Sequence, residues 1–316
     1  MIGGVDESKT AVLPAILSNF MHHIAAGLED GTVISGQNAI SHPGAPTALS
    51  SSAAPSPSIE PQDESKHIRY AADPIEEDAM PPSTLPDLRL SSIAFSKAHE
   101  TPLPSPIRRI WYISPYGHET RPSPNPNVLS ALNSSEAIIY SIGSLYTSLI
   151  PSLILRGIGE SIAQRPKAKK ILILNGSLDR ETGGYEAVDF VTAIARACQE
   201  SQDPPGEHNT TMTSHLHPSS SSHTPSNLHT RQSQAQLRPP SAYVTHLIHL
   251  EGEGTPMVDK ILLNQMGIEC VRLYGRKGLA GETGVRYDER ALVQALGAIL
   301  GRRDAEGRSR RNTLET

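Results

Sequence analysis

A glycine and a row of hydroxyl side chains follow an apolar run near the middle of the chain. Residues 137–148 read AIIYSIGSLYTS. A glycine at a strand end lets the backbone approach a ligand closely, and hydroxyls can surround a phosphate together with N–H groups that begin a helix. The pattern predicts a phosphate-binding loop, and a strand-to-helix turn with capping hydroxyls is the structural alternative. The candidate ligand-binding residues are Gly143, Ser144, Tyr146, Thr147 and Ser148.

A second polar loop separates an apolar run from a helical pattern. It covers residues 175–185 and reads NGSLDRETGGY. Asn175 is suited to contact a sugar or a base, and Thr182 is suited to contact a phosphate. Asp179 and Glu181 carry the oxygen ligands that Mg²⁺ prefers, so they form a candidate metal site. The alternative is a polar loop around a glycine turn that binds no ligand.

Other polar segments carry weaker signals. The glycines of residues 251–256 (EGEGTP) precede an expected helix and suit an anion, but their two glutamates oppose one. Arg276 and Lys277 are suited to meet a phosphate, and a surface loop is the alternative. His22 and His23 are adjacent, so they face opposite sides of a strand and we expect structural roles. No Ser-His-Asp or Cys-His constellation can be assigned, so catalytic residues stay unknown.

The elements that position these loops follow from the hydrophobic pattern. Strands five or six residues long, apolar nearly throughout, alternate with helices, which predicts a Rossmann-like α/β fold with a mostly parallel sheet covered on both faces. Ligands bind such sheets beyond the C-terminal strand ends, where the three loops lie. Asp30-Gly31 predicts a hairpin. The expected strands are 11–17, 20–28, 32–37, 109–113, 137–142, 170–175, 243–250 and 269–273, and the expected helices are 126–133, 186–200, 256–266 and 288–300.

Composition divides the chain into folded and polar parts. Hydrophobic residues make up 37% of the 316 residues, below the ~45–50% of an ordinary domain. Residues 43–106 are rich in Pro, Ser and Ala, and residues 202–240 are rich in Ser and His. We expect both to be disordered insertions, the second a solvated linker, and 302–316 to be a basic tail. The remaining residues, 1–42, 107–201 and 241–301, form one predicted domain.

The net charge, the apolar runs and the cysteine content indicate the cellular compartment and the kinds of binding partner. The formal net charge is −5, which argues against a general nucleic-acid binder. There is no apolar run of ~18 residues, so no membrane span is expected, and the N-terminus lacks a signal-peptide pattern. The two cysteines, Cys198 and Cys270, form no disulfide framework or zinc site. We expect a cytoplasmic protein that binds neither nucleic acid nor membrane.

Four segments, in the same order, resemble the CofD/YvcK family. The bacterial branch has a strand, then Gly-Pro-Gly-Ser-Leu-Tyr-Thr-Ser and Ile-Pro-Asn-Leu, which residues 142–153 (IGSLYTSLIPSL) match closely. Residues 125–129 (NPNVL) resemble the family's Asn-Pro-x-Val-Leu. Residues 28–38 resemble its Leu-Glu-Asp-Gly hairpin with a following Asn, and residues 181–185 resemble Gly-Glu-Thr-x-Gly-Tyr. The insertions and the sequence of 19–26 (NFMHHIAA) resemble the fungal branch.

The resemblance implies two functions. CofD enzymes transfer a phospholactyl-type group from a nucleotide diphosphate donor to a deazaflavin alcohol, with Mg²⁺, which implies a 2-phospho-L-lactate transferase-type protein. YvcK proteins bind a UDP-sugar and regulate carbon metabolism and cell-wall supply, which implies a non-catalytic gluconeogenesis-factor-like regulator. Whether the chain is an enzyme, and whether it forms a homo-oligomer, stay open. The carried-over ligand-side residues are Asn38, Gly143, Ser144, Thr147, Ser148 and Asn175.

The sequence departs from the family pattern at three places. Ser141-Ile142-Gly143 replaces Gly-Pro-Gly, so one glycine is absent. Phe190 stands where the bacterial pattern has His. The family opens with a strand and a Gly-rich turn that cradles the ligand, whereas residues 1–4 (MIGG) have no strand before them. We therefore expect this chain to begin partway through the domain.

Overall fold

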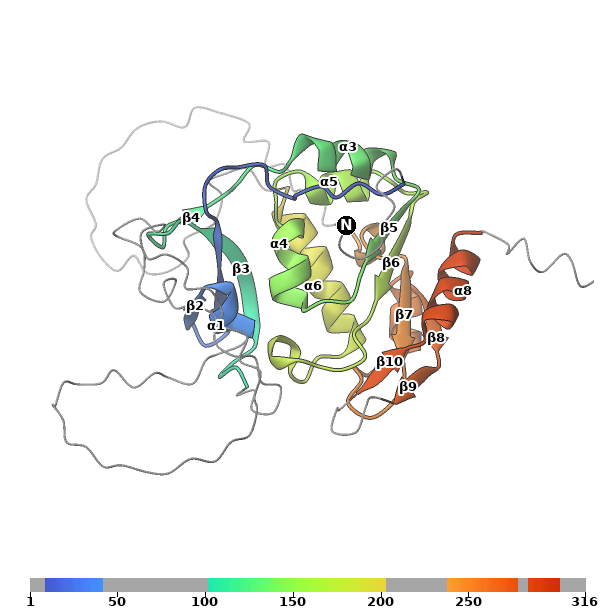
Figure 1. Ribbon diagram of the computed structural model, residues 1–316. Coiled ribbons are helices and arrows are strands. Elements are labelled where there is room, and N and C mark those ends of the chain that lie inside the picture. Colours follow the sequence, from blue (N-terminus) through green and yellow to red (C-terminus); the bar gives the residue numbers. More distant parts are fainter. Residues whose placement is uncertain (1–8, 42–101, 203–237, 278–283, 302–316) are drawn as a thin grey trace, which may run out of the picture.

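The computed structural model describes residues 9–41, 102–202, 238–277 and 284–301 (Figure 1). The predicted insertions and the basic tail lie almost entirely outside the described residues, as does the His-rich segment. Within the described ranges, every helix is too short or too polar to cross a membrane.

A parallel sheet forms the centre of the fold. Its strands are β5 (Ala137–Tyr140), β6 (Lys169–Ile173), β7 (His246–Leu250) and β8 (Glu269–Leu273), in that spatial order and all parallel. All of β7 and four of the five residues of β6 are buried. Strands that are apolar nearly throughout are typical of a parallel sheet that is covered on both faces. The predicted α/β fold class is therefore confirmed.

Helices cover both faces of this sheet (Figure 1). On one face, α6 (Ala187–Glu200) packs Val191 and Ile194 into the core that contains Leu172 and Leu247. On the other, α8 (Glu289–Ile299) packs around Ala295 against Ile171, Ile173 and Ile248. Neighbouring residues of β6 therefore serve opposite cores, as strand geometry demands. Further short helices are α3 (Pro126–Ser134), α4 (Ile150–Leu153), α5 (Ile158–Ala163), η5 (Pro240–Ala242) and α7 (Lys260–Gln265).

A second, antiparallel sheet lies beside α4 and α6 (Figure 1). Its spatial order is β2 (Val33–Ser35), β1 (His23–Leu28), β3 (Ile107–Ile113) and β4 (Glu119–Thr120). The Asp30-Gly31 hairpin is confirmed: Gly31 has φ +90°, and the Asp30 carboxylate accepts the Thr32 N–H. The expected strand 109–113 is part of β3 and belongs to this sheet. The short helix α1 (Gln37–Ser41) follows β2.

One expected strand is wrong, one expected helix begins later than expected, and one strand is less buried than expected. Residues 11–17 form no strand, and only Ile16 makes a bridge, to Pro124. The helix expected at Pro256 begins at Lys260, because the Asp259 carboxylate caps it, while the Met257 carbonyl accepts the Ala187 N–H and holds this stretch extended. Strand β5 pairs only with β6 in the described sheet, which leaves Ile139 exposed.

A hairpin that the sequence pattern did not predict covers part of the C-terminal edge of the parallel sheet. It consists of β9 (Gly275–Lys277) and β10 (Val285–Tyr287). The Tyr287 hydroxyl donates to the Leu174 carbonyl at 2.6 Å, and the Val285 N–H donates to the Gly176 carbonyl. A Cβ on Gly176 would lie 1.9 Å from the Val285 carbonyl oxygen, so β10 requires glycine there.

Substituting Gly176→Ala is expected to lower the free energy of unfolding by about 1–3 kcal/mol, because the added methyl group pushes β10 from β6. Urea denaturation measures this. The matched control is Gly183→Ala, at a position with φ −53° and open space around an added Cβ. Equal unfolding curves for the two variants would show that β10 does not lie against Gly176.

Candidate functional site

Hydrogen bonds join the three predicted loops at the C-terminal edge of the parallel sheet. The Asn175 side-chain amide donates to the Gly143 carbonyl at 3.2 Å, which joins the loops after β6 and β5. The Leu178 N–H donates to the Gly254 carbonyl at 3.2 Å, which joins the loops after β6 and β7. The sheet therefore assembles residues that are distant in the sequence into one region.

The loop after β5 turns at once into a helical segment. The π-helical turn η3 covers Leu145–Leu149, and Ser144 precedes it without a side-chain capping bond. A Cβ on Gly143 would lie 3.1 Å from the Ser148 Cβ, so these two residues face each other closely. In the described part of the chain, no hydrogen bond occupies the hydroxyl of Ser144 or of Ser148. These two hydroxyls are available to a ligand.

Glu181 occupies the other polar groups of this loop. Its Oε2 accepts the backbone N–H groups of Tyr146, at 2.8 Å, and Thr147, at 3.1 Å. Its Oε1 accepts the Thr147 hydroxyl at 2.5 Å. Only 2% of Glu181 is exposed. The Glu181 carboxylate therefore accepts hydrogen bonds from three groups that the sequence analysis expected to bind a phosphate. The candidate residues of this loop divide into Tyr146 and Thr147, which bind Glu181, and Ser144 and Ser148, whose hydroxyls do not.

The environment of Glu181 changes its protonation. The pKa of this carboxyl is raised to about 7; burial is the largest cause, and the charge of Asp179 acts in the same direction. The hydrogen bonds from Thr147 and from the two backbone N–H groups act in the opposite direction. Near neutral pH the group is therefore a mixture of carboxylate and carboxylic acid.

The short helix η4 (Arg180–Thr182) holds Glu181 in place and links it to α1. The Asp179 carboxylate caps η4 by accepting the Glu181 and Thr182 N–H groups. The Arg180 guanidinium donates to the carbonyls of Ala39, at 2.8 Å, and Ile40, at 2.6 Å. Helix α1, with the exposed side chain of Asn38, therefore lies beside the loops.

Thr182 and Asp179 form a closed pair rather than an open site. Thr182 is buried, and its hydroxyl donates to Asp179 Oδ1 at 2.7 Å and accepts the Asp179 N–H at 3.2 Å. This is the reciprocal capping box that the Asp-x-x-Thr spacing favours. The spacing was therefore a signal for a cap, and Thr182 has no group left over for a phosphate.

The carboxylates predicted to hold magnesium do not fit an ion as they are arranged. Both oxygens of Glu181 accept hydrogen bonds from the loop, and Asp179 Oδ1 accepts three. Among the residues that the structure describes, no three His, Cys, Asp or Glu side chains group in a way that could hold a metal. Magnesium binding stays a prediction, and no chemical step is derived from it.

The weaker candidates have structural partners. Glu251 pairs with Lys260 and Arg272, at 3.4 and 2.8 Å, and Arg276 pairs with Asp288. A Cβ on Gly252 would lie 2.5 Å from a methyl group of Val285, so the loop after β7 accommodates the hairpin β9–β10. These contacts favour the structural interpretation of the loop at 251–256 and of Arg276.

The chain is similar to several known proteins. The family model described as 2-phospho-L-lactate transferase CofD matches residues 4–299. An uncharacterized protein of Saccharomyces cerevisiae is 38% identical over 193 residues, which are 58% of this chain and 43% of that protein. A putative gluconeogenesis factor of Thermotoga maritima is 38% identical over 79 residues, 25% of each chain.

Solved structures also match. In one of them, a Bacillus halodurans protein, the match covers 91% of this chain and 61% of that protein, with 18% identity and a TM-score of 0.49. The matched regions span less than half of the yeast relative and a quarter of the Thermotoga relative.

Proposed function

The chain belongs to the CofD family, and from this premise we propose that it binds a nucleoside diphosphate or a nucleotide sugar through the loop after β5. The diphosphate lies against Gly143, Ser144 and Ser148, with Asn175 and Asn38 on the ligand side. Tyr146, Thr147 and Thr182, which were candidates from the sequence, are left out of this contact set because their polar groups have partners within the chain.

One observation carries the proposal. The hydroxyls of Ser144 and Ser148 have no partner within the described residues, and Gly143 faces Ser148 without a side chain between them. They lie beyond the C-terminal end of β5, where ligands bind parallel sheets. Hydroxyl groups can donate hydrogen bonds to the oxygens of a diphosphate.

The activity that we propose is a CofD-like group transfer at phosphorus, of the 2-phospho-L-lactate transferase type. The oxygen of an alcohol forms a new P–O bond to the donor, the P–O bond to the nucleotide breaks, the nucleotide leaves, and the alcohol proton passes to solvent. In this chemistry the protein mainly positions the reactants and stabilises charge. Gly143, Ser144 and Ser148 would hold the diphosphate. Glu181 would fix the loop without touching the reacting atoms, because its oxygens face Tyr146 and Thr147.

A second candidate is a regulator that binds a UDP-sugar without converting it. Relatives named gluconeogenesis factors support it. The hydrogen bonding of Glu181 supports it too, since the carboxyl of the loop with a pKa near 7 is engaged and not free to take a proton from an alcohol. In either case a cytoplasmic location is part of the proposal, supported by two free cysteines.

Calorimetric titration with UDP, GDP and a UDP-sugar, with and without Mg²⁺, tests the proposal. Saturable binding is expected, and Ser148→Ala is expected to weaken it about tenfold by removing one charge-assisted hydrogen bond. Ser152→Ala, an exposed serine in α4, is the matched control. No binding by the wild type would overturn the proposal. Recovery of the bound nucleotide unchanged in the presence of alcohols would favour the regulator.

A further inference from the structure

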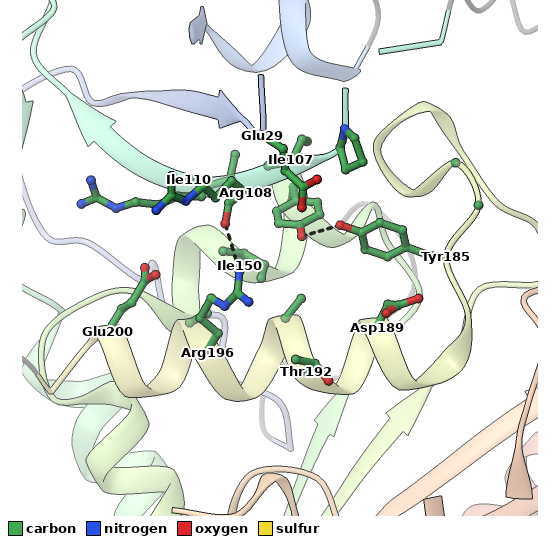
Figure 2. A pocket seen from close by; sticks show the side chains of 17 residues that line it. Glu29, Ile107, Arg108, Ile110, Ile150, Tyr185, Asp189, Thr192, Arg196 and Glu200 are labelled. Atoms are coloured by element: carbon green, nitrogen blue, oxygen red, sulfur yellow. Dashed lines mark hydrogen bonds between the residues drawn. The ribbon is translucent and has the colours of Figure 1, made fainter. Parts of the chain in front are cut away.

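A cavity of about 330 Å³ lies between β3 and α6 (Figure 2). Tyr146 and Ile150 form part of its wall, together with Tyr185 and the β3 residues 107–110. One face of α6 forms the opposite wall (Figure 2). The volume is at the lower end of the range for small-molecule sites.

Small residues keep this cavity open. Ala193 and Ala197 face it from α6, and Gly183 and Gly184 face it from the preceding loop. Ala197 is a buried core residue and Ala193 packs against the same core, so the cavity borders the core at these two small side chains.

Hydrogen-bond donors line the cavity. The hydroxyls of Tyr146 and Tyr185 lie 2.8 Å apart. One of the two hydroxyl protons forms the hydrogen bond between these oxygens, so the second hydroxyl proton is free for a hydrogen bond to a ligand. Burial is the main cause that raises the pKa of both hydroxyls, so both stay protonated. The Arg196 guanidinium reaches across from α6 and donates only a long bond, 3.4 Å, to the Arg108 carbonyl (Figure 2).

Acceptors lie around these donors. Glu29, Asp189 and Glu200 line the cavity (Figure 2). Asp189 Oδ2 accepts the Glu186 N–H and caps α6, and Arg109, which also lines the cavity, is bound to Glu119. An oxyanion therefore suits the donors, Arg196 and the tyrosine pair, and a hydroxyl group on the same ligand suits the carboxylate of Glu29.

We propose that this cavity binds a small oxyanion that carries hydroxyl groups, either a carboxylate or a phosphate monoester. The site is separate from the nucleotide loop, since Tyr146 presents its backbone to Glu181 and its side chain to the cavity. The proposal does not depend on the function proposed above.

The test is calorimetric titration of the whole chain with glycerol 3-phosphate, glycerate and glycerol. Saturable binding is expected for at least one of the two anions and not for glycerol. Whichever of the two anions binds more tightly shows whether the site prefers a phosphate monoester or a carboxylate. Arg196→Gln and Tyr185→Phe are each expected to weaken binding about tenfold.

Controls separate this site from others. Arg290→Gln, which changes an exposed arginine on α8, should leave the affinity for the anion unchanged. Tyr185→Phe keeps the ring, so the fold is retained. The proposal is overturned if neither anion saturates the wild type, or if Arg196→Gln and Tyr185→Phe bind as the wild type does.

Discussion

Replacing Glu181 with alanine is expected to lower the free energy of unfolding by about 3–5 kcal/mol. The substitution leaves the N–H groups of Tyr146 and Thr147 and the Thr147 hydroxyl without their acceptor in a buried place. Unsatisfied buried donors are among the few causes of losses this large. Urea denaturation followed by circular dichroism measures the change.

Glu181→Gln is the matched control for this prediction. Glutamine keeps the shape of the side chain and one carbonyl oxygen that accepts the two backbone N–H groups. It is expected to lose far less stability than the alanine variant. If both variants unfold like the wild type, Glu181 does not hold the loop.

The same carboxyl is expected to make stability depend on pH. Its pKa rises from the ordinary value of 4.5 to about 7 in the folded protein, so the folded state keeps a proton that the unfolded state releases. The stabilising contribution is complete below pH 4.5 and is lost as the pH rises through 7. Its size is about 3 kcal/mol by linkage.

Comparing wild type with Glu181→Gln isolates this contribution from those of the other carboxyls. The difference in unfolding free energy, wild type minus variant, should fall by about 3 kcal/mol between about pH 4.5 and 8. Parallel curves for the two proteins across this range would show that the pKa of Glu181 is not raised.

Much of the architecture follows from local patterns in the sequence. The strand β8 begins and ends at the expected residues, and Asn125 and Asp288 cap α3 and α8. These features depend on neighbours within a few residues, so local chemistry determines them. The Asp30-Gly31 turn is of the same kind.

Contacts between residues that are far apart in the sequence could not be predicted from such local patterns. Glu181 meets Thr147 across 34 positions, so its role as acceptor was hidden by its suitability as a metal ligand. The short strands β9 and β10 are stabilised by packing on Gly176, Gly252 and Leu174 rather than by their own residues. Helix α7 begins after Asp259 rather than at Pro256 because the Met257 carbonyl accepts the N–H of Ala187, the first residue of α6.

The central claim is that Gly143, Ser144 and Ser148 bind the nucleotide while Tyr146 and Thr147 hold Glu181. Its most direct test is a titration of Ser148→Ala and Thr147→Val with UDP and GDP, beside urea denaturation of both. We predict that Ser148→Ala loses about tenfold in affinity and no stability. Thr147→Val should keep its affinity and lose about 1–2 kcal/mol of stability. Affinity lost in Thr147→Val but kept in Ser148→Ala would contradict the account.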